Sequence, residues 1–169
     1  VEVDDLLKAA EDKGEPPFLL LLDEIEDPHN LGSILRTADC TGAHGVILPK
    51  RRSAQITATV SKTSAGAVEY VPVARVTNLG QTIDQLKEMG VWVVGTVVDA
   101  VQELYDTDVF DGPVAIVIGN ENKGMGRLIR EKCDVLVKLP MAGTINSLNA
   151  SVAAGVVMYE VLRRRRLQG

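Results

Sequence analysis

Short apolar runs of strand length alternate with helical patterns along most of the chain, and this alternation constrains the fold more than any other feature. A continuous apolar run of about four to eight residues is typical of a buried strand, whereas a helix repeats its apolar residues every three or four positions. Strands that alternate with helices predict an α/β fold with a mostly parallel sheet and helices on both faces. The strand-like runs are 18–22, 45–48, 70–73, 91–98, 114–118 and 135–139, and the helical patterns are 30–40, 77–89, 127–132 and 148–166.

Length favours one compact domain behind a short N-terminal segment. The chain has 169 residues, enough to bury one sizeable core. Residues 3–13 form an amphipathic helical pattern, and the helix breakers at 14–17 follow it. We interpret residues 1–17 as a linker or N-terminal extension and residues 18–169 as the main domain. Because the sequence begins with Val1 rather than Met, we expect a piece of a longer protein.

Composition predicts a soluble protein of a reducing compartment. No apolar run reaches the about 18 to 20 residues that a membrane-spanning helix needs. Cys40 and Cys133 lie 93 positions apart, without the spacing of metal ligands or of a disulfide framework. We therefore expect a cytoplasmic protein with no membrane association and no bound metal. His29 and His44 are interpreted as structural residues, and Trp92 and Met158 as core residues.

The net charge of −5 hides an uneven distribution. Residues 1–27 carry ten acidic and two basic side chains, whereas the remainder carries thirteen acidic and sixteen basic ones. Basic residues cluster at 50–52 and at 163–166. The second cluster is either a solvated helix end, favoured by the helix dipole, or a contact for RNA phosphates. The charge pattern permits nucleic-acid binding without requiring it.

Three segments with glycine and polar side chains each follow a predicted strand, where open α/β sheets place their ligand sites. The first segment is 27–38. Asn30 suits a helix N-cap, and capping is the alternative to a functional role for this residue. Arg36 lies on a short helix otherwise filled by apolar and small residues, so a functional role is favoured over that of a surface arginine.

The second segment, 115–126, is a buried strand that ends in a glycine-rich turn. Glycines allow backbone amides to approach a ligand closely. Their spacing, at 119, 124 and 126, fits neither the dinucleotide-binding fingerprint nor a P-loop. Taken alone, Glu121 is better explained as a partner of the turn amides or of Lys123.

The third segment, 139–151, combines a proline, a glycine loop and several hydrogen-bonding side chains at the start of a helix. Ser147, Asn149 or Ser151 could each serve as a helix cap. The whole cluster has more polar groups than one cap requires, and it therefore indicates a binding loop.

Together, these segments resemble the three signature motifs of the SpoU (TrmH) family of RNA ribose methyltransferases. They read Asp-Pro-His-Asn-Leu-Gly from Asp27 with Arg36, Gly-Asn-Glu-Asn-Lys-Gly from Gly119, and Pro-Met-Ala-Gly from Pro140 with Ser-Leu-Asn-Ala-Ser from Ser147. The motifs occur in the family's order, and the similarity covers about residues 18–162.

The resemblance implies a deep C-terminal trefoil knot, a homodimer and S-adenosyl-L-methionine as the cofactor. Chain topologies otherwise avoid knots, so the knot is expected only because the family has it. In the family the cofactor is held mostly by backbone groups, which the resemblance places at Gly119, Leu139 and Leu148. The cofactor-binding residues implied are Thr96, Ile118, Gly119, Leu139, Met141, Ser147, Leu148 and Asn149.

Family catalytic and substrate roles carry over to Asn30, Arg36, Glu121, Ser147 and Asn149. The family's arginine is regarded as a base, but a guanidinium keeps its proton at neutral pH. We hypothesise that Arg36 grips the phosphate beside the target ribose and stabilises the forming alkoxide, assisted by Ser147. Asn30 and Glu121 would hold the loop and the ribose in register.

The resemblance implies methylation of a ribose 2′-hydroxyl in RNA, most closely that of a guanosine in bacterial 23S ribosomal RNA. Two alternatives remain: a transfer-RNA or antibiotic-resistance ribosomal RNA methyltransferase, and an RNA-binding module without turnover. A dinucleotide-dependent oxidoreductase is disfavoured because the glycine spacing is wrong. Family members often carry an N-terminal RNA-recognition domain, and residues 1–17 are too short to form one.

Overall fold

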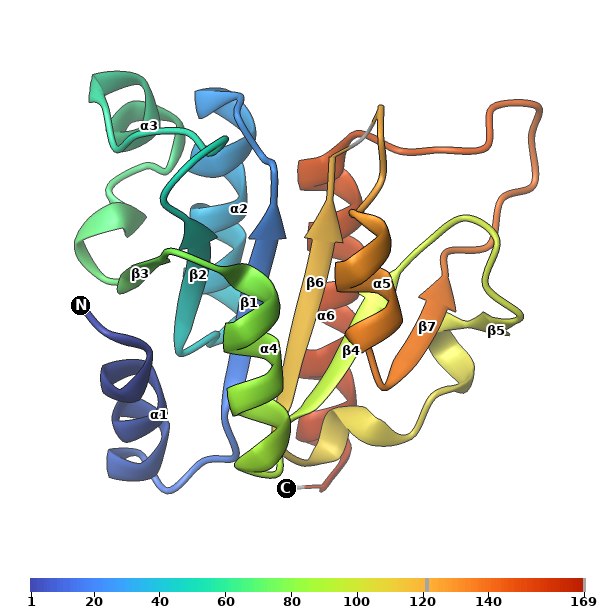
Figure 1. Ribbon diagram of the computed structural model, residues 1–169, viewed down its shortest axis with the longest axis horizontal. Coiled ribbons are helices and arrows are strands. Elements are labelled where there is room, and N and C mark those ends of the chain that lie inside the picture. Colours follow the sequence, from blue (N-terminus) through green and yellow to red (C-terminus); the bar gives the residue numbers. More distant parts are fainter. Residues whose placement is uncertain (121, 169) are drawn as a thin grey trace.

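A parallel sheet of seven strands forms the centre of the computed structural model, which describes residues 1–120 and 122–168 (Figure 1). The strand order is β3-β2-β1-β6-β4-β7-β5, and every neighbouring pair is parallel, as the alternating pattern predicts. The strands are β1 (Phe18–Asp23), β2 (Gly45–Pro49), β3 (Val73–Val76), β4 (Trp92–Thr96), β5 (Gln102–Glu103), β6 (Val114–Gly119) and β7 (Val135–Lys138).

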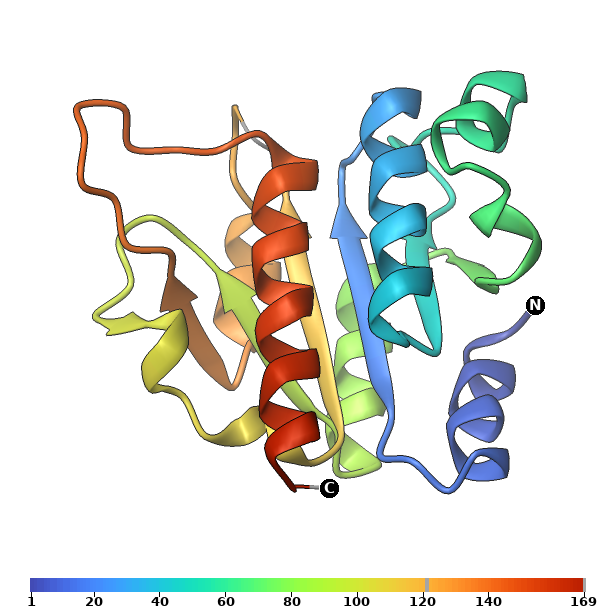
Figure 2. The ribbon, with the colours of Figure 1, turned by 180° about the vertical axis from the view of Figure 1, so that it is seen from behind.

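Helices cover both faces of the sheet. Figure 2 shows α2 and α6 on one face, and Figure 1 shows α4 and α5 on the other, which confirms the predicted arrangement. None of the helices in the described ranges is long and apolar enough to cross a membrane. The helices are α1 (Val3–Asp12), α2 (Pro28–Thr41), α3 (Ala58–Thr63), α4 (Leu79–Glu88), α5 (Arg127–Lys132) and α6 (Ala150–Gln168), with 3₁₀ turns at Ala67–Glu69, Leu104–Asp106 and Val109–Asp111.

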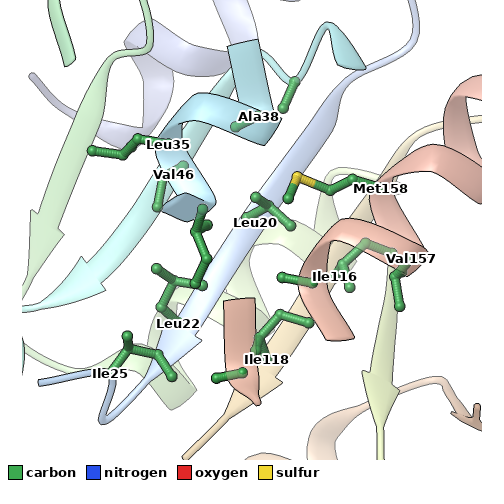
Figure 3. Close-up of a cluster of buried hydrophobic side chains, with 14 of the residues drawn as sticks. Leu20, Leu22, Ile25, Leu35, Ala38, Val46, Ile116, Ile118, Val157 and Met158 are labelled. Carbon is green, nitrogen blue, oxygen red and sulfur yellow. The ribbon is translucent and has the colours of Figure 1, made fainter. Parts of the chain in front are cut away.

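The central strands are buried on both faces. Successive side chains of a strand point to opposite sides, so Leu20 packs beneath α2 and α6 while Leu19 and Leu21 belong to the cluster on the opposite face. Figure 3 shows the first cluster, in which Met158 of α6 is fully buried, as expected from the sequence. Burial of each such side chain stabilises the fold by about 1.5–3 kcal/mol. This continuous burial explains why the strands lack alternating polar residues.

Most of the C-terminal arginine run is bound to the rest of the chain rather than solvated. Arg165 donates to the carbonyl oxygens of Pro16 (2.8 Å) and Gly112 (2.8 Å), and also to those of Pro17 and Phe110. Its guanidinium lies 5.5 Å from the centroid of the Phe18 ring. Arg163 pairs with Glu160, and Arg164 donates to the Thr107 carbonyl. Intrachain contacts therefore explain three of these four arginines.

His44 joins the same region. Its Nδ1 accepts a hydrogen bond from the Phe18 N–H at 2.9 Å, and its Nε2 lies 2.9 Å from a carboxylate oxygen of Glu15. With Nδ1 as an acceptor, the ring is neutral and Nε2 donates to Glu15. Burial lowers the pKa of His44 below its ordinary value, against the opposing effect of Glu15. The interpretation of His44 as structural is confirmed.

Some local predictions are wrong. Trp92 begins β4 and is 49% exposed, so it is not a core residue. The strand expected at 70–73 begins instead at Val73, because a 3₁₀ turn occupies Ala67–Glu69 and Tyr70 faces solvent. The short α3 and β5 were not expected, since neither has a repeated apolar pattern long enough to read.

Candidate functional site

The carboxyl ends of the parallel strands meet at one edge of the sheet, here called the carboxyl edge, which is marked by Asp23 of β1, Thr96 of β4, Gly119 of β6 and Lys138 of β7. The chain leaves β1 toward β2 on one side, whereas β6 and β4 lie on the other side. Such a change of direction opens a crevice in which α/β proteins bind ligands. All three sequence motifs follow strands that end at this edge.

The glycine-rich turn after β6 is closed by its own backbone. The N–H of Asn120 donates to the Gly124 carbonyl at 3.1 Å, and the Gly124 N–H donates back at 2.6 Å. Gly124 has φ +69°, a conformation that favours glycine. A Cβ at Gly119 would lie only 2.4 Å from the Met125 nitrogen, so the close approach of the two chain segments requires glycine at this position.

Asn120 fastens this turn to the end of β1. Its side-chain amide donates to the Glu24 carbonyl at 3.1 Å, while its Oδ1 accepts from the backbone N–H groups of Asn122 (2.8 Å) and Lys123 (3.2 Å). Sequence reasoning had not singled out Asn120, although its place inside the second motif was a usable signal. Contacts within the chain therefore define the shape of this turn.

Acidic groups at the end of β1 have defined partners. Asp23 accepts from the Gly126 N–H at 2.7 Å, and burial raises the pKa of this carboxyl despite that bond. Glu24 accepts from Arg52 at 2.9 Å and lies 3.9 Å from the Lys123 ammonium. The Arg52 hydrogen bond lowers the pKa of Glu24. These contacts tie the ends of β1, β2 and β6 together.

A cavity of about 520 Å³ opens between the ends of β4, β6 and β7 and the loop that leads into α6. Its volume lies within the range of about 300–1,000 Å³ typical of pockets for small ligands. Asp99 and Arg130 form an ion pair of 2.9 Å among its lining residues, and the Arg130 hydrogen bond lowers the pKa of Asp99. The cavity is lined by seven of the residues expected to bind the cofactor: Thr96, Ile118, Gly119, Leu139, Met141, Ser147 and Leu148.

Asn149, the eighth expected residue, is not among the lining residues of this cavity. Its Oδ1 accepts from the N–H groups of Ser151 (2.9 Å) and Val152 (3.3 Å). These bonds make Asn149 the cap of α6, one of the alternatives that the sequence left open. Its catalytic and cofactor roles remain predictions.

A second cavity of about 230 Å³ adjoins the first and shares the lining residues Asn120, Asn122 and Ala150 with it. Asn30 lines this second cavity. The expectation that Asn30 could cap α2 is wrong, because Asp27 accepts from the His29 N–H at 2.8 Å and Pro28 begins the helix. The side chain of Asn30 is thereby free of a capping role.

One expected catalytic residue, Arg36, lies outside these cavities. Arg36 is exposed and lines neither of them. It lies six residues beyond Asn30, which is about 9 Å along the axis of α2. Glu121 lies outside the described residues. Among residues 1–120 and 122–168, no group of three or more His, Cys, Asp or Glu side chains is arranged to hold a metal ion.

A parallel α/β sheet with a ligand-sized cavity at the carboxyl ends of its strands defines the class of α/β nucleotide- and cofactor-binding proteins. The model of the SpoU rRNA methylase family matches residues 17–159 of this chain. The chain therefore belongs to the SpoU rRNA methylase family.

Individual relatives agree with this assignment. The TrmH family protein YacO of Bacillus subtilis (strain 168) is 61% identical over 168 residues, which are 99% of this chain and 67% of that protein. The SpoU methyltransferase AviRb of Streptomyces viridochromogenes superposes with a TM-score of 0.83 at 34% identity, over 91% of this chain and 62% of its own. Another AviRb structure, in complex with the cofactor AdoMet, has a TM-score of 0.82 at 33% identity, over 92% of this chain and 60% of its own. This chain thus spans about two thirds of YacO and about three fifths of AviRb.

Proposed function

We propose that this chain is the catalytic part of an enzyme that transfers a methyl group from S-adenosylmethionine to a ribose 2′-hydroxyl of RNA. One observation carries the proposal: residues of the second and third motifs line a single cavity at the carboxyl edge, Gly119 from the second and Leu139, Met141, Ser147 and Leu148 from the third. The AdoMet complex of AviRb supports the choice of cofactor.

The cavity suits this cofactor in its chemistry. Apolar side chains of Ile118, Leu139 and Leu148 offer a surface for a flat adenine ring, and the Ser147 hydroxyl offers a hydrogen-bonding group. When bound, S-adenosylmethionine supplies a methyl group activated by a positively charged sulfur. The residues that line the cavity would hold the cofactor.

The adjoining cavity provides a place for the target ribose. Asn30 lines it, and the walls that the two cavities share would bring the ribose close to the cofactor. A ribose hydroxyl is a poor nucleophile, so its alignment and the stabilisation of its developing negative charge dominate the catalysis. We assign alignment to Asn30 and Glu121, and charge stabilisation to Arg36 with help from Ser147. The transfer would form the ribose O–C bond and break the bond between sulfur and the methyl group, with S-adenosylhomocysteine as the leaving group and solvent water as the acceptor of the hydroxyl proton.

The exposed position of Arg36 supports a homodimer in which this residue acts on the partner's site. Because Arg36 lies outside both cavities of its own chain, a second copy packed along α2 and α6 would place it near the ribose. A mixture of inactive Arg36→Ala and inactive Leu148→Asp chains should then recover about a quarter of the wild-type activity, because mixed dimers hold one intact site. No recovery would place Arg36 in its own chain's site.

We also propose the trefoil knot of the family for residues 119–149. The loop from β7 to α6 and the turn after β6 line the same cavity, and this proximity supports the proposal. A crystal structure with bound S-adenosylmethionine, traced through this region, tests the crossing.

The substrate that we propose is a guanosine of 23S ribosomal RNA, methylated in the cytoplasm. Transfer of a radioactive methyl group to 23S ribosomal RNA, transfer RNA and their fragments, followed by nucleoside analysis, tests this choice. If only transfer RNA is labelled, the proposed substrate is wrong, whereas the proposed methyl-transfer reaction still holds.

Calorimetric titration with S-adenosylmethionine tests the cofactor site itself. Leu148→Asp introduces a charge into the cavity wall and should weaken binding at least tenfold, or about 1.4 kcal/mol. Leu167→Asp is the matched control, because Leu167 is exposed near the far end of α6. If wild-type protein fails to bind, or if both variants lose affinity equally, the proposed cofactor site is wrong.

A further inference from the structure

The two basic clusters of the sequence have different positions and different partners. In the C-terminal run, three of the four arginines are engaged with Glu160 or with backbone carbonyls. In the cluster at 50–52, the Lys50 N–H donates to the Val76 carbonyl at 2.8 Å, but the side chains of Lys50 and Arg51 are exposed and have no hydrogen-bond or ion-pair partner among residues 1–120 and 122–168. Of the two basic clusters, the one at 50–52 therefore offers more unneutralised positive charge, on the side chains of Lys50 and Arg51.

This cluster lies beside the site. Lys50 directly follows β2, so it lies at the carboxyl edge. Two residues after Lys50, Arg52 donates a hydrogen bond to Glu24, which lines the cavity proposed for the ribose. On the other side of Glu24 stands Lys123, whose side chain is 72% exposed. A row of positive groups thus runs from the end of β2 to the rim of the cofactor cavity.

The loop that carries the cluster is held in one shape. The Ser53 hydroxyl donates to the Pro49 carbonyl at 2.6 Å, and Arg75 donates to the Ser53 hydroxyl at 3.0 Å and to the Ala54 carbonyl at 2.7 Å. The Ala54 N–H donates to Ile25 of the β1–α2 loop at 3.0 Å. An ordered loop loses little further backbone freedom when it binds a ligand.

The acidic helix α1 lies away from this loop. The acidic helix α1 packs through Leu6 against Gly45, at the start of β2, and Figure 1 shows it at the opposite edge of the sheet. The excess of acidic side chains on α1 disfavours the approach of a polyanion along that helix. The repeated charge of a nucleic-acid strand matches adjacent basic side chains, because each one can neutralise a phosphate.

We infer that the loop 50–52 binds the phosphodiester backbone of the RNA strand beside the target ribose, an inference that rests on the proposed function. Lys50 and Arg51 contact phosphates, Arg52 is fixed by Glu24 as the inner end of the row, and Lys123 extends it toward the cofactor. This loop supplies RNA affinity within the chain itself, apart from any recognition domain.

Binding of a fluorescent single-stranded RNA of about 12 nucleotides, followed by anisotropy at several salt concentrations, tests the inference. In Lys50→Ala/Arg51→Ala, the affinity should fall about tenfold, and the slope of log affinity against log salt should decrease by about 1.4, the value for two lost phosphate contacts. The control Lys8→Ala/Lys13→Ala removes the same charge from the α1 side and should bind RNA within about twofold of wild type.

The outcomes separate the two proposals. S-adenosylmethionine titrations on the same preparations report the cofactor site, and this site should be unaffected in both variants. Wild-type protein that fails to bind the RNA, unchanged binding by the loop variant, or an equal loss in both variants would overturn the role of loop 50–52. Failure of wild-type protein to bind S-adenosylmethionine would instead refute the proposed function.

Discussion

The two edges of the sheet are made by the same strands but treat their polar groups differently. At the edge where the strands begin, Arg165 bonds to four backbone carbonyls and His44 bonds to Phe18 and Glu15. At the carboxyl edge, every residue from 140 to 149 is exposed, and two connected cavities are open. Arg165 and His44 at the first edge are engaged in contacts within the chain, whereas the carboxyl edge combines such contacts, as in the Asp99–Arg130 pair, with an exposed loop beside the cavities.

This difference gives separate expectations for variants at the two edges. A change at the first edge should alter the free energy of unfolding without altering ligand affinity in the folded protein. A change at the carboxyl edge should alter ligand affinity more than stability. Measuring both the free energy of unfolding and the ligand affinity of each variant therefore tests whether the two edges differ in this way.

The largest effect on stability is expected from Arg165→Ala. The substitution removes a half-buried guanidinium and leaves the carbonyls of Pro16 and Gly112 without this partner, which should cost about 3 kcal/mol in the free energy of unfolding. Urea denaturation measures this cost, with Arg166→Ala at the neighbouring exposed position as the control. Equal midpoints for the two variants would show that the arginine bonds do not stabilise this edge.

Gly119→Ala should have the next largest effect. Its new Cβ would press on the Met125 backbone and force the turn to move, at a cost of about 2 kcal/mol, with weaker S-adenosylmethionine binding. Gly112→Ala is the control, because a Cβ there meets no atom within 4 Å. Calorimetry measures the S-adenosylmethionine affinity of both variants, and urea denaturation measures their free energies of unfolding. If Gly119→Ala binds S-adenosylmethionine with wild-type affinity, this turn is not part of the cofactor site.

The pH dependence of stability should contain a smaller contribution from His44. Burial lowers the pKa of this histidine in the folded protein, so the unfolded chain takes up a proton more readily. The stabilising contribution is complete above the ordinary histidine pKa of about 6.5 and declines as the pH falls below it. Thermal unfolding between pH 5 and pH 8 should show this decline in wild type and a shallower one in His44→Gln. The same slope in both proteins would assign the decline to other groups.

Arg52→Gly should change stability least. The substitution removes an exposed ion pair with Glu24, worth about 0–1 kcal/mol, but it also relieves the left-handed backbone of Arg52 at φ 56°. The two effects should nearly cancel, leaving the free energy of unfolding within about 0.5 kcal/mol of wild type. A loss above about 2 kcal/mol in urea denaturation would mean that the Arg52–Glu24 pair organises this loop.

Element type was predictable wherever a buried element has a long apolar pattern. The runs that form β1 and β6 are apolar almost throughout because both faces of these strands are covered. Prediction failed where side chains face solvent or tertiary contacts decide. Trp92 is apolar but exposed, and the polar segment that contains α3 has no strong apolar period.

For the site, the motif sequences identified most of the cavity lining, including Gly119 and Leu148. They did not reveal Asn120 as the fastening of the turn or the Asp99–Arg130 pair, since these depend on partners distant in sequence. Similarly, Asn30 and Asp27 are both good capping residues, and only the observed start of α2 shows that Asp27 is the cap.

The sequence by itself determined the alternation of strands and helices, the family, and the residues that carry its motifs, because all of these are local patterns. The tertiary structure alone decided how two similar basic clusters differ. Arg165 lies against backbone carbonyls at one edge, while Lys50 and Arg51 project at the other. A charge gains its role from the groups that the fold brings near it, and sequence position does not specify that neighbourhood.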